Sequence, residues 1–219
     1  MAGYKAHMAF GMATGLGWSI VAFMLSLVTV WFIPFIIIVT VVGAFLPDLD
    51  SDTGVPLKIL LTVFSIIGVI VIGWIVINQE GRSLLELCGV SIFTGLFIYY
   101  GIGGIIKKVT HHRGIFHSIP AVILATLISL TILNQFQLDA NIIIALSLGV
   151  GLGYLCHLIL DELNSAVNLG GIPFIPNKSI GTALKLYSKN WKISLVVYAA
   201  VGWLLFQNWE NIMNFIKEY

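Results

Sequence analysis

The sequence predicts an all-α, polytopic membrane protein with about seven transmembrane helices. Of its 219 residues, 58% are hydrophobic and only 10% are charged, and the mean hydropathy is +1.00. A soluble globular domain carries about 25% charged residues, so this composition excludes an aqueous surface. Long apolar runs without charges are typical of helices that cross a bilayer. We expect one transmembrane domain over residues 1–219.

The first apolar run is long enough for two helices. No charged residue occurs between Met8 and Leu46, and a straight helix of this length would measure about 58 Å, roughly twice the hydrocarbon thickness. We therefore predict a helical hairpin that turns near "VWFIPF", with Trp31 at the membrane interface and Pro34 near the start of the second helix. The run is too long for a signal peptide, so the first helix is expected to be retained.

The remaining spans are predicted at about 58–78, 84–106, 119–136, 141–161 and 192–209. The connection over residues 162–191 is rich in Gly, Pro and Asn, and loops of this length are usually functional or mobile. Seven helices would place nine of the 11 lysines and arginines on the face that holds the N-terminus. By the positive-inside rule that face, with the 162–191 loop, is expected to be cytoplasmic, and the protein is expected to cross a cell membrane several times. The net charge of +1 argues against a nucleic-acid partner.

All five histidines fall on the predicted cytoplasmic face, although they come from three distant segments. They are accompanied there by several aspartates. The histidines are His7, His111, His112, His117 and His157, and the aspartates are Asp48, Asp50, Asp52 and Asp161. This clustering predicts a site for a divalent metal, Zn²⁺ or Mn²⁺, because neutral imidazoles and carboxylates suit these ions.

The strongest pair is His157 and Asp161, which are spaced i, i+4 and so share one helical face. The alternative is a hydrogen-bonded histidine at a helix interface and an aspartate at a helix end. The "DLDSD" segment is no EF-hand, because Thr53 and Ile59 stand where that loop needs Gly and Glu. We predict Asp48 and Asp50 as ligands, and a solvated or outer position for Asp52.

The segment "KKVTHHRGIFHSIP" divides by function. We predict His112 and His117 as ligands, His112 in preference to His111. Arg113 suits phosphate, since its planar fork can hold two oxygens. Lys107 and Lys108 are assigned to the lipid interface. Ser118 is read as a helix N-cap in preference to a nucleophile.

Three motifs together resemble the YdjM-like family of LexA-binding, inner membrane-associated metal-dependent hydrolases. They are an "LPDLD" turn (46–50), an "HRGxxHS" box (112–118) and a "GYLxHLxxD" helix (153–161) followed by "GGIPFIP", and His7 near the first helix start also matches. The family is distantly similar to the zinc-dependent phospholipase C and single-strand nuclease superfamily. By that resemblance His157 and Asp161 are the foremost ligands, followed by Asp48, His117 and His7.

The resulting hypothesis is a membrane-embedded metal-dependent hydrolase that cleaves a phosphoester of a phospholipid or another lipid-linked phosphate. Arg113, with Lys178 as a weaker candidate, is expected to bind the phosphate, and Asp50 or Asp52 to act as general base. The expected partners are membrane lipids and, by the resemblance alone, a regulatory protein. The alternatives are an ion or small-solute transporter with a His/Asp cation site, and a non-catalytic regulatory membrane protein.

Overall fold

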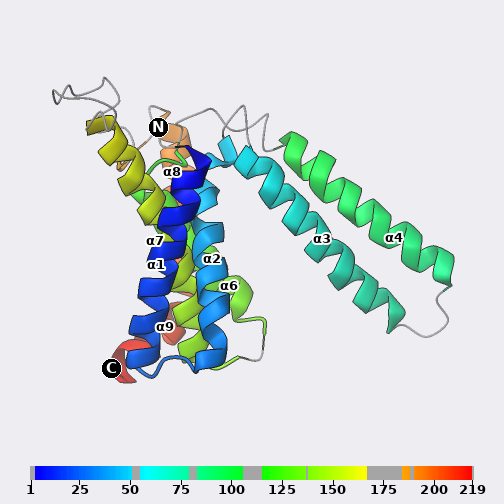
Figure 1. Cartoon of the computed structure of the whole chain (residues 1–219), viewed down its shortest axis with the longest axis horizontal. Coiled ribbons are helices and arrows are strands. Elements are labelled where there is room, and N and C mark those ends of the chain that lie inside the picture. Colours follow the sequence, from blue (N-terminus) through cyan, green and yellow to red (C-terminus); the bar gives the residue numbers. More distant parts are fainter. Residues whose placement is uncertain are drawn as a thin grey trace. The chain divides into compact units, whose positions relative to one another are not determined.

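The computed structural model describes residues 3–50, 55–78, 83–105, 115–136, 138–166, 184–187 and 190–218 (Figure 1). Every regular element in these ranges is helical, which confirms the all-α prediction; a lone parallel bridge pairs Ser118 with Lys185. The contacts between residues group the chain into two compact units. The first unit comprises residues 1–47 and 113–219, and the second comprises residues 48–112.

The first unit is a helical bundle arranged around α7. Its helices are α1 (Tyr4–Met24), α2 (Ile33–Phe45), α6 (Ile119–Leu133), α7 (Ala140–Ala166), α8 (Trp191–Gln207) and α9 (Trp209–Glu218). Helix α7 packs against α1, α2 and α6 (Figure 1), and α8 packs against α6. Because α7 contacts most of the other helices of this unit, side chains on α7 are positioned by the whole bundle.

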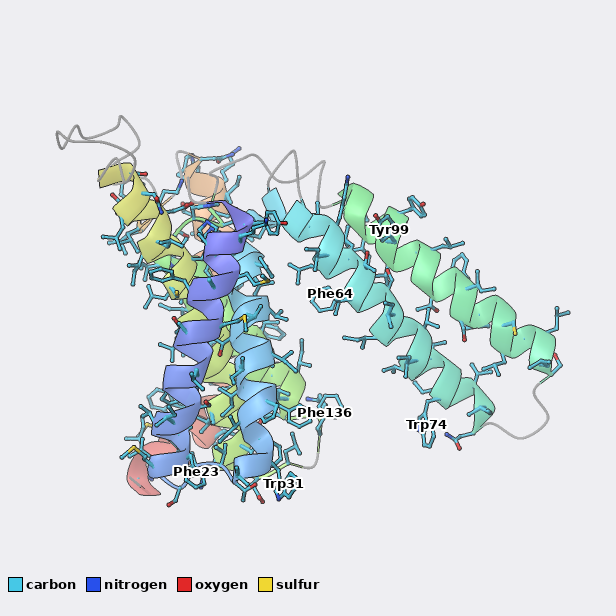
Figure 2. All side chains as sticks on the ribbon, in the orientation of Figure 1. Phe23, Trp31, Phe64, Trp74, Tyr99 and Phe136 are labelled. Carbon is cyan, nitrogen blue, oxygen red and sulfur yellow. The ribbon has the colours of Figure 1, made fainter. Side chains whose placement is uncertain are left out.

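The predicted α1–α2 hairpin is confirmed. Helix α1 ends with Ser26 in the left-handed region at φ 58°, while the Leu27 N–H donates to the Ala22 carbonyl at 2.9 Å. This is a Schellman-type end, a position at which glycine is the usual residue. A 3₁₀ turn, η1 (Val30–Phe32), then leads into α2, whose first turn holds the expected proline. Phe23 and Trp31 lie at this end of the unit (Figure 2), and Trp31 is 80% exposed.

Two glycines bring α2 and α7 into backbone contact. A Cβ placed on Gly43 would lie 2.2 Å from the Val150 carbonyl oxygen, and one on Gly153 would lie 1.9 Å from the Thr40 carbonyl oxygen. No larger residue fits at either place unless the helices separate. Such small-residue contacts are a common way for transmembrane helices to approach closely. Here they set the spacing of α2 and α7 one turn below the site.

The second unit is a helical hairpin. It begins within the 3₁₀ turn η2 (Leu46–Asp50) and contains α3 (Val55–Ile77), α4 (Leu84–Leu96) and a π-helical continuation, η3 (Phe97–Ile102). Ser83 and Glu86 form a capping box at the start of α4. Gly68 faces Ile98, and Gly95 faces Val69, so small residues again lie at the contact of the two helices.

Within the ranges that the structure describes, five helices are long and apolar enough to cross a membrane, and two shorter apolar helices accompany them. The long ones cover 4–24, 30–48, 57–77, 84–105 and 140–165, and the shorter ones cover 119–133 and 191–207. The boundaries of these helices agree with those of the predicted spans except in two places, and the number of membrane spans stays a prediction. Helix α7 continues to Ala166, five residues beyond the predicted end, and the separate helix α9 was not predicted.

Candidate metal centre

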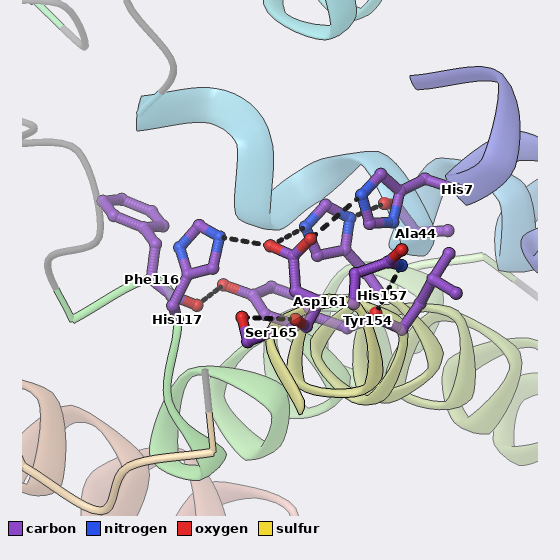
Figure 3. Close-up of polar contacts among 10 residues, drawn as sticks. His7, Ala44, Phe116, His117, Tyr154, His157, Asp161 and Ser165 are labelled. Atoms are coloured by element: carbon purple, nitrogen blue, oxygen red, sulfur yellow. Dashed lines mark hydrogen bonds and ion pairs between the residues drawn. The ribbon is translucent and has the colours of Figure 1, made fainter. Parts of the chain in front are cut away.

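Four side chains of the first unit converge at one end of α7. His157 and Asp161 lie on α7, His7 lies in the second turn of α1, and His117 directly precedes the N-cap of α6 (Figure 3). All four are buried, with exposed fractions of 0–2%. An ionisable group costs much free energy at such a place, so this grouping favours a functional role.

The Asp161 carboxylate is the centre of the group. Its Oδ2 lies 3.6 Å from His117 Nε2 and 3.7 Å from His157 Nε2, and its Oδ1 lies 3.4 Å from His7 Nε2 (Figure 3). An ordinary N–H···O hydrogen bond measures about 2.7–3.2 Å. The three nitrogen–oxygen distances are therefore longer than those of direct hydrogen bonds, although the Nε2 atoms of all three histidines lie near the same carboxylate.

These separations fit a metal ion. With metal–nitrogen and metal–oxygen bonds of about 2.0–2.2 Å and tetrahedral angles, two ligand atoms on one zinc ion lie about 3.3–3.6 Å apart. The 3.6 and 3.7 Å distances from Asp161 Oδ2 to His117 and His157 lie at and just above the upper end of this range. His117, His157 and Asp161 form a buried group whose candidate ligand atoms all lie within 4.8 Å of one another. The donor set of two imidazoles and one carboxylate also suits Zn²⁺. The residues present can thus hold a divalent metal.

The tautomer of His157 follows from its second contact. Its Nδ1 lies 2.7 Å from the backbone carbonyl oxygen of Ala44 at the end of α2. Since a carbonyl only accepts, Nδ1 carries the proton and donates it. The lone pair of the neutral ring is therefore on Nε2, the atom that faces Asp161. A carbonyl that fixes a histidine in this way is the usual outer support of a metal ligand.

His117 is held by its neighbours in the chain. The Tyr154 hydroxyl donates to the Phe116 carbonyl at 2.6 Å, and the Ile119 N–H donates to the Lys185 carbonyl at 3.0 Å. The Ser118 side chain accepts from the Ala121 N–H, which confirms the predicted N-cap. The backbone on both sides of His117 is therefore fixed to α7, α6 and the 184–187 segment.

His7 has a different relation to the group. Its ring stacks on that of His157 with centroids 3.7 Å apart and planes 13° from parallel. The lone pair of an imidazole lies in the ring plane, so one ion cannot lie in both of these planes. His117, in contrast, meets His157 edge to face at 69°. His117 and His157 can share an ion, whereas His7 either orients the Asp161 carboxylate or binds another ion.

The other predicted residues are only partly described. Asp48 lies in η2 as the first residue of the second unit and is half-buried. The backbone of Asp50 ends η2, but its side chain lies outside the described part of the chain. The described part of the chain also leaves out the other positions named in the sequence analysis, which are Asp52, Lys107, Lys108, His111, His112, Arg113 and Lys178. Their roles remain predictions from the sequence.

Three supporting features were not predicted as part of the site: the Ala44 carbonyl, the Tyr154 hydroxyl and the glycine contact of α2 with α7. A backbone carbonyl has no sequence signature. Gly153 and Tyr154, however, lie four and three residues before His157, which places them on the same side of α7. This spacing from His157 was the feature of the sequence that could have placed Gly153 and Tyr154 at the site.

The YdjM inner membrane protein family matches the chain over residues 1–217. The chain belongs to this family. The match supports the resemblance drawn from the three motifs, and it agrees with a chain rich in apolar helices. No curated protein and no solved structure matches it.

Proposed function

We propose that the chain is a membrane-embedded, metal-dependent hydrolase that cleaves the phosphoester of a lipid-linked substrate. The observation that supports this most directly is the buried set of His117, His157 and Asp161. Catalytic zinc sites use three protein ligands and keep a fourth position for water or substrate. When bound, the metal would supply a water of lowered pKa and would polarise the phosphoryl oxygen.

The chain's own residues would prepare this chemistry. The Ala44 carbonyl holds the His157 proton on Nδ1, so that Nε2 faces the metal position. The His7 imidazole lies against Asp161 Oδ1 and leaves Oδ2 directed at the other two histidines. Arg113 and Lys178 are proposed to bind the phosphate, and Asp50 to accept a proton from the attacking water.

The depth of the site favours an amphiphilic substrate. Asp161 lies five residues before the end of α7, about 7.5 Å along the helix, and His7 lies three residues, about 4.5 Å, after the start of α1. A headgroup layer is about 5–7.5 Å thick, so helix ends that reach the water would place these residues at the level of the lipid headgroups. Tyr4 and Met8 flank this level of α1 with partly exposed apolar side chains. A headgroup phosphate can meet the site while its acyl or prenyl chains remain in the bilayer.

The transporter alternative finds less support. The described histidines lie at one end of the first unit, whereas a transport path needs polar groups across the bilayer. Below the site, α2 and α7 are in backbone contact at Gly43 and Gly153, which leaves no room for a solute between these two helices. The buried Thr40 and Ser147 hydroxyls donate to carbonyls of their own helices.

The decisive experiment couples metal analysis to a substrate screen. The purified full chain is analysed for zinc and manganese and then tested on phospholipids and polyprenyl phosphates in nanodiscs. We expect a bound transition metal and release of a phosphorylated headgroup or of inorganic phosphate. Asp161→Ala and His157→Ala should abolish both. Asp139→Asn is the matched control, because Asp139 is an exposed aspartate next to the other end of α7.

The outcomes separate the candidate functions. A wild-type chain without transition metal would overturn the proposal. Metal binding without hydrolysis, but with cation movement across proteoliposomes, would establish the transporter instead. Metal binding with neither activity would point to a regulatory membrane protein.

A further inference from the structure

We propose that α9 is an interfacial helix whose exposed apolar flank binds the lipid surface of the membrane, at the end of the first unit away from the metal centre. Helix α9 follows α8 directly. Its Phe215 packs against the core cluster that contains Leu27 and Val28, next to the α1–α2 turn. The metal centre, in contrast, includes His7 at the beginning of α1. The proposal does not depend on the proposed hydrolase activity.

The side chains of α9 form three stripes. At 100° per residue, Ile212 and Phe215 lie about 60° apart, and both pack against the core of the bundle. Trp209 and Ile216 lie about 20° apart, and they are 57% and 59% exposed. The polar stripe holds Glu210, Asn211, Asn214 and Lys217, which are all exposed. The helix therefore has a packed apolar face and a second, open apolar flank beside it.

The break between α8 and α9 is fixed by a buried polar network. Asn208 is 3% exposed and lies between the two helices. Its Oδ1 accepts from Asn134 Nδ2 at 2.9 Å, and its Nδ2 donates to Thr131 Oγ1 and to the Leu204 carbonyl, both at 2.8 Å. This network ties the turn to the end of α6, so α9 begins at a defined level where α6 and α8 end.

That level has the features of a membrane interface. Trp31 at the neighbouring α1–α2 turn is exposed, as are Trp203 and Phe206 in the last turns of α8. Tryptophan is enriched where a bilayer meets water. Trp209 continues this aromatic surface onto α9. An amphipathic helix that begins where an apolar helix ends is placed to lie in the headgroup region.

Lipid fits the open flank better than a second copy of the chain. Trp209 and Ile216 offer on the order of 300 Å² of apolar surface, whereas a stable protein interface needs about 800 Å² from each partner. The charges of Glu210, Lys217 and Glu218 nearly cancel. Insertion of the apolar flank, and not attraction to anionic headgroups, should therefore hold the helix.

Site-directed spin labelling of the full chain tests this. p-Acetylphenylalanine replaces Ile216 or Asn214 and carries a ketoxime nitroxide, so the native cysteines remain. Positions 214 and 216 are about 160° apart on the helix. In nanodiscs we expect the ratio of collision with oxygen to collision with a water-soluble nickel reagent to be at least about threefold higher at 216 than at 214, as for a helix whose one face lies in lipid.

Two results would overturn the proposal. Equal access of the nickel reagent to both positions would show that the flank lies in water. Protection of position 216 from both reagents, together with spin–spin broadening, would show that a second copy covers it. Size-exclusion profiles in detergent that match the wild type establish that the labelled chains are folded, and nanodiscs large enough for two chains leave the second-copy outcome open.

Discussion

Replacement of Gly153 by alanine tests how the α2–α7 contact positions the metal centre. The new Cβ would lie 1.9 Å from the Thr40 carbonyl oxygen, and real Cβ atoms keep at least 3.0 Å from such neighbours. Helix α2 must therefore withdraw by at least about 1.1 Å. Ala44 lies one turn further along α2, and its 2.7 Å bond to His157 Nδ1 would lengthen to about 3.8 Å if the carbonyl moves along the bond.

The expected loss follows from this displacement. Removal of the outer partner of a metal-bound histidine lowers metal affinity by about 10–100-fold. The forced separation of the helices should also cost about 1–3 kcal/mol of stability, partly offset by the higher helix propensity of alanine, about 1 kcal/mol. Competition with a chromophoric chelator measures the affinity, and thermal unfolding in detergent measures the stability.

The matched control is Gly17→Ala in α1, where a Cβ would meet nothing within 4 Å. This variant should keep wild-type affinity and gain a little helix stability. If Gly153→Ala kept the wild-type metal affinity with full helix content, the close approach of α2 and α7 would not be what positions His157. Gly15→Ala is a milder substitution, because its Cβ would lie 3.0 Å from Ile37 Cα in α2. It loosens the contact of α1 with α2 without changing a residue of α7, so it shows whether general loosening of the bundle is enough to lower metal affinity.

Four further predictions follow from single contacts. Tyr154→Phe removes the hydrogen bond to the backbone before His117, worth about 1 kcal/mol, and should lower metal affinity roughly fivefold in a chelator competition. Ser26→Gly relieves the positive φ and should raise stability by about 0.5–1 kcal/mol in thermal unfolding. Asn208→Leu leaves the partly buried amide of Asn134 without this partner and should lower stability by about 1–3 kcal/mol. A reporter fused after Tyr219 should be active only outside the cytoplasm, as seven spans require.

Each of these has an outcome that speaks against it. If Tyr154→Phe bound cobalt with the wild-type affinity and absorption spectrum, Tyr154 would have no role in positioning the site. A destabilised Ser26→Gly would mean that unfolded-state entropy outweighs the strain at this turn. If Asn208→Leu were as stable as the wild type, α9 would not depend on the polar network. A cytoplasmic reporter signal would reduce the number of spans to an even one.

The sequence was sufficient for the architecture because a bilayer imposes strong constraints. Local helix geometry is enough to interpret three of the sequence features. These are the uninterrupted apolar runs, the proline at the start of α2 and the i, i+4 spacing of His157 and Asp161. The convergence of His7 and His117 on Asp161 needed only the topology. The end of α7 was missed because Glu162, Asn164 and Ser165 are polar.

Other features depend on long-range packing, which cannot be inferred from local patterns in a single sequence. Helix α9 was overlooked because its apolar residues follow α8 almost without interruption, and only the tertiary bonds of Asn208 separate the two helices. The stacking of His7 on His157 depends on the crossing of α1 and α7. No periodicity reports that crossing, so the sequence could group these histidines but could not assign them different roles.

The convergence on Asp161 has a consequence for the assembly of the protein. His7 and His117 are 110 positions apart in the chain, and they meet at a carboxylate carried by a third segment. An ion held by His117, His157 and Asp161 would act as a cross-link between α7 and the start of α6, closing a loop that is entropically costly to close, and α1 would join it through the contact of His7 with Asp161. At a free metal concentration 100 times the dissociation constant, such a cross-link would add about 2.7 kcal/mol to stability. Metal supply would then govern how much of the chain survives in the membrane, as well as how much of it is active.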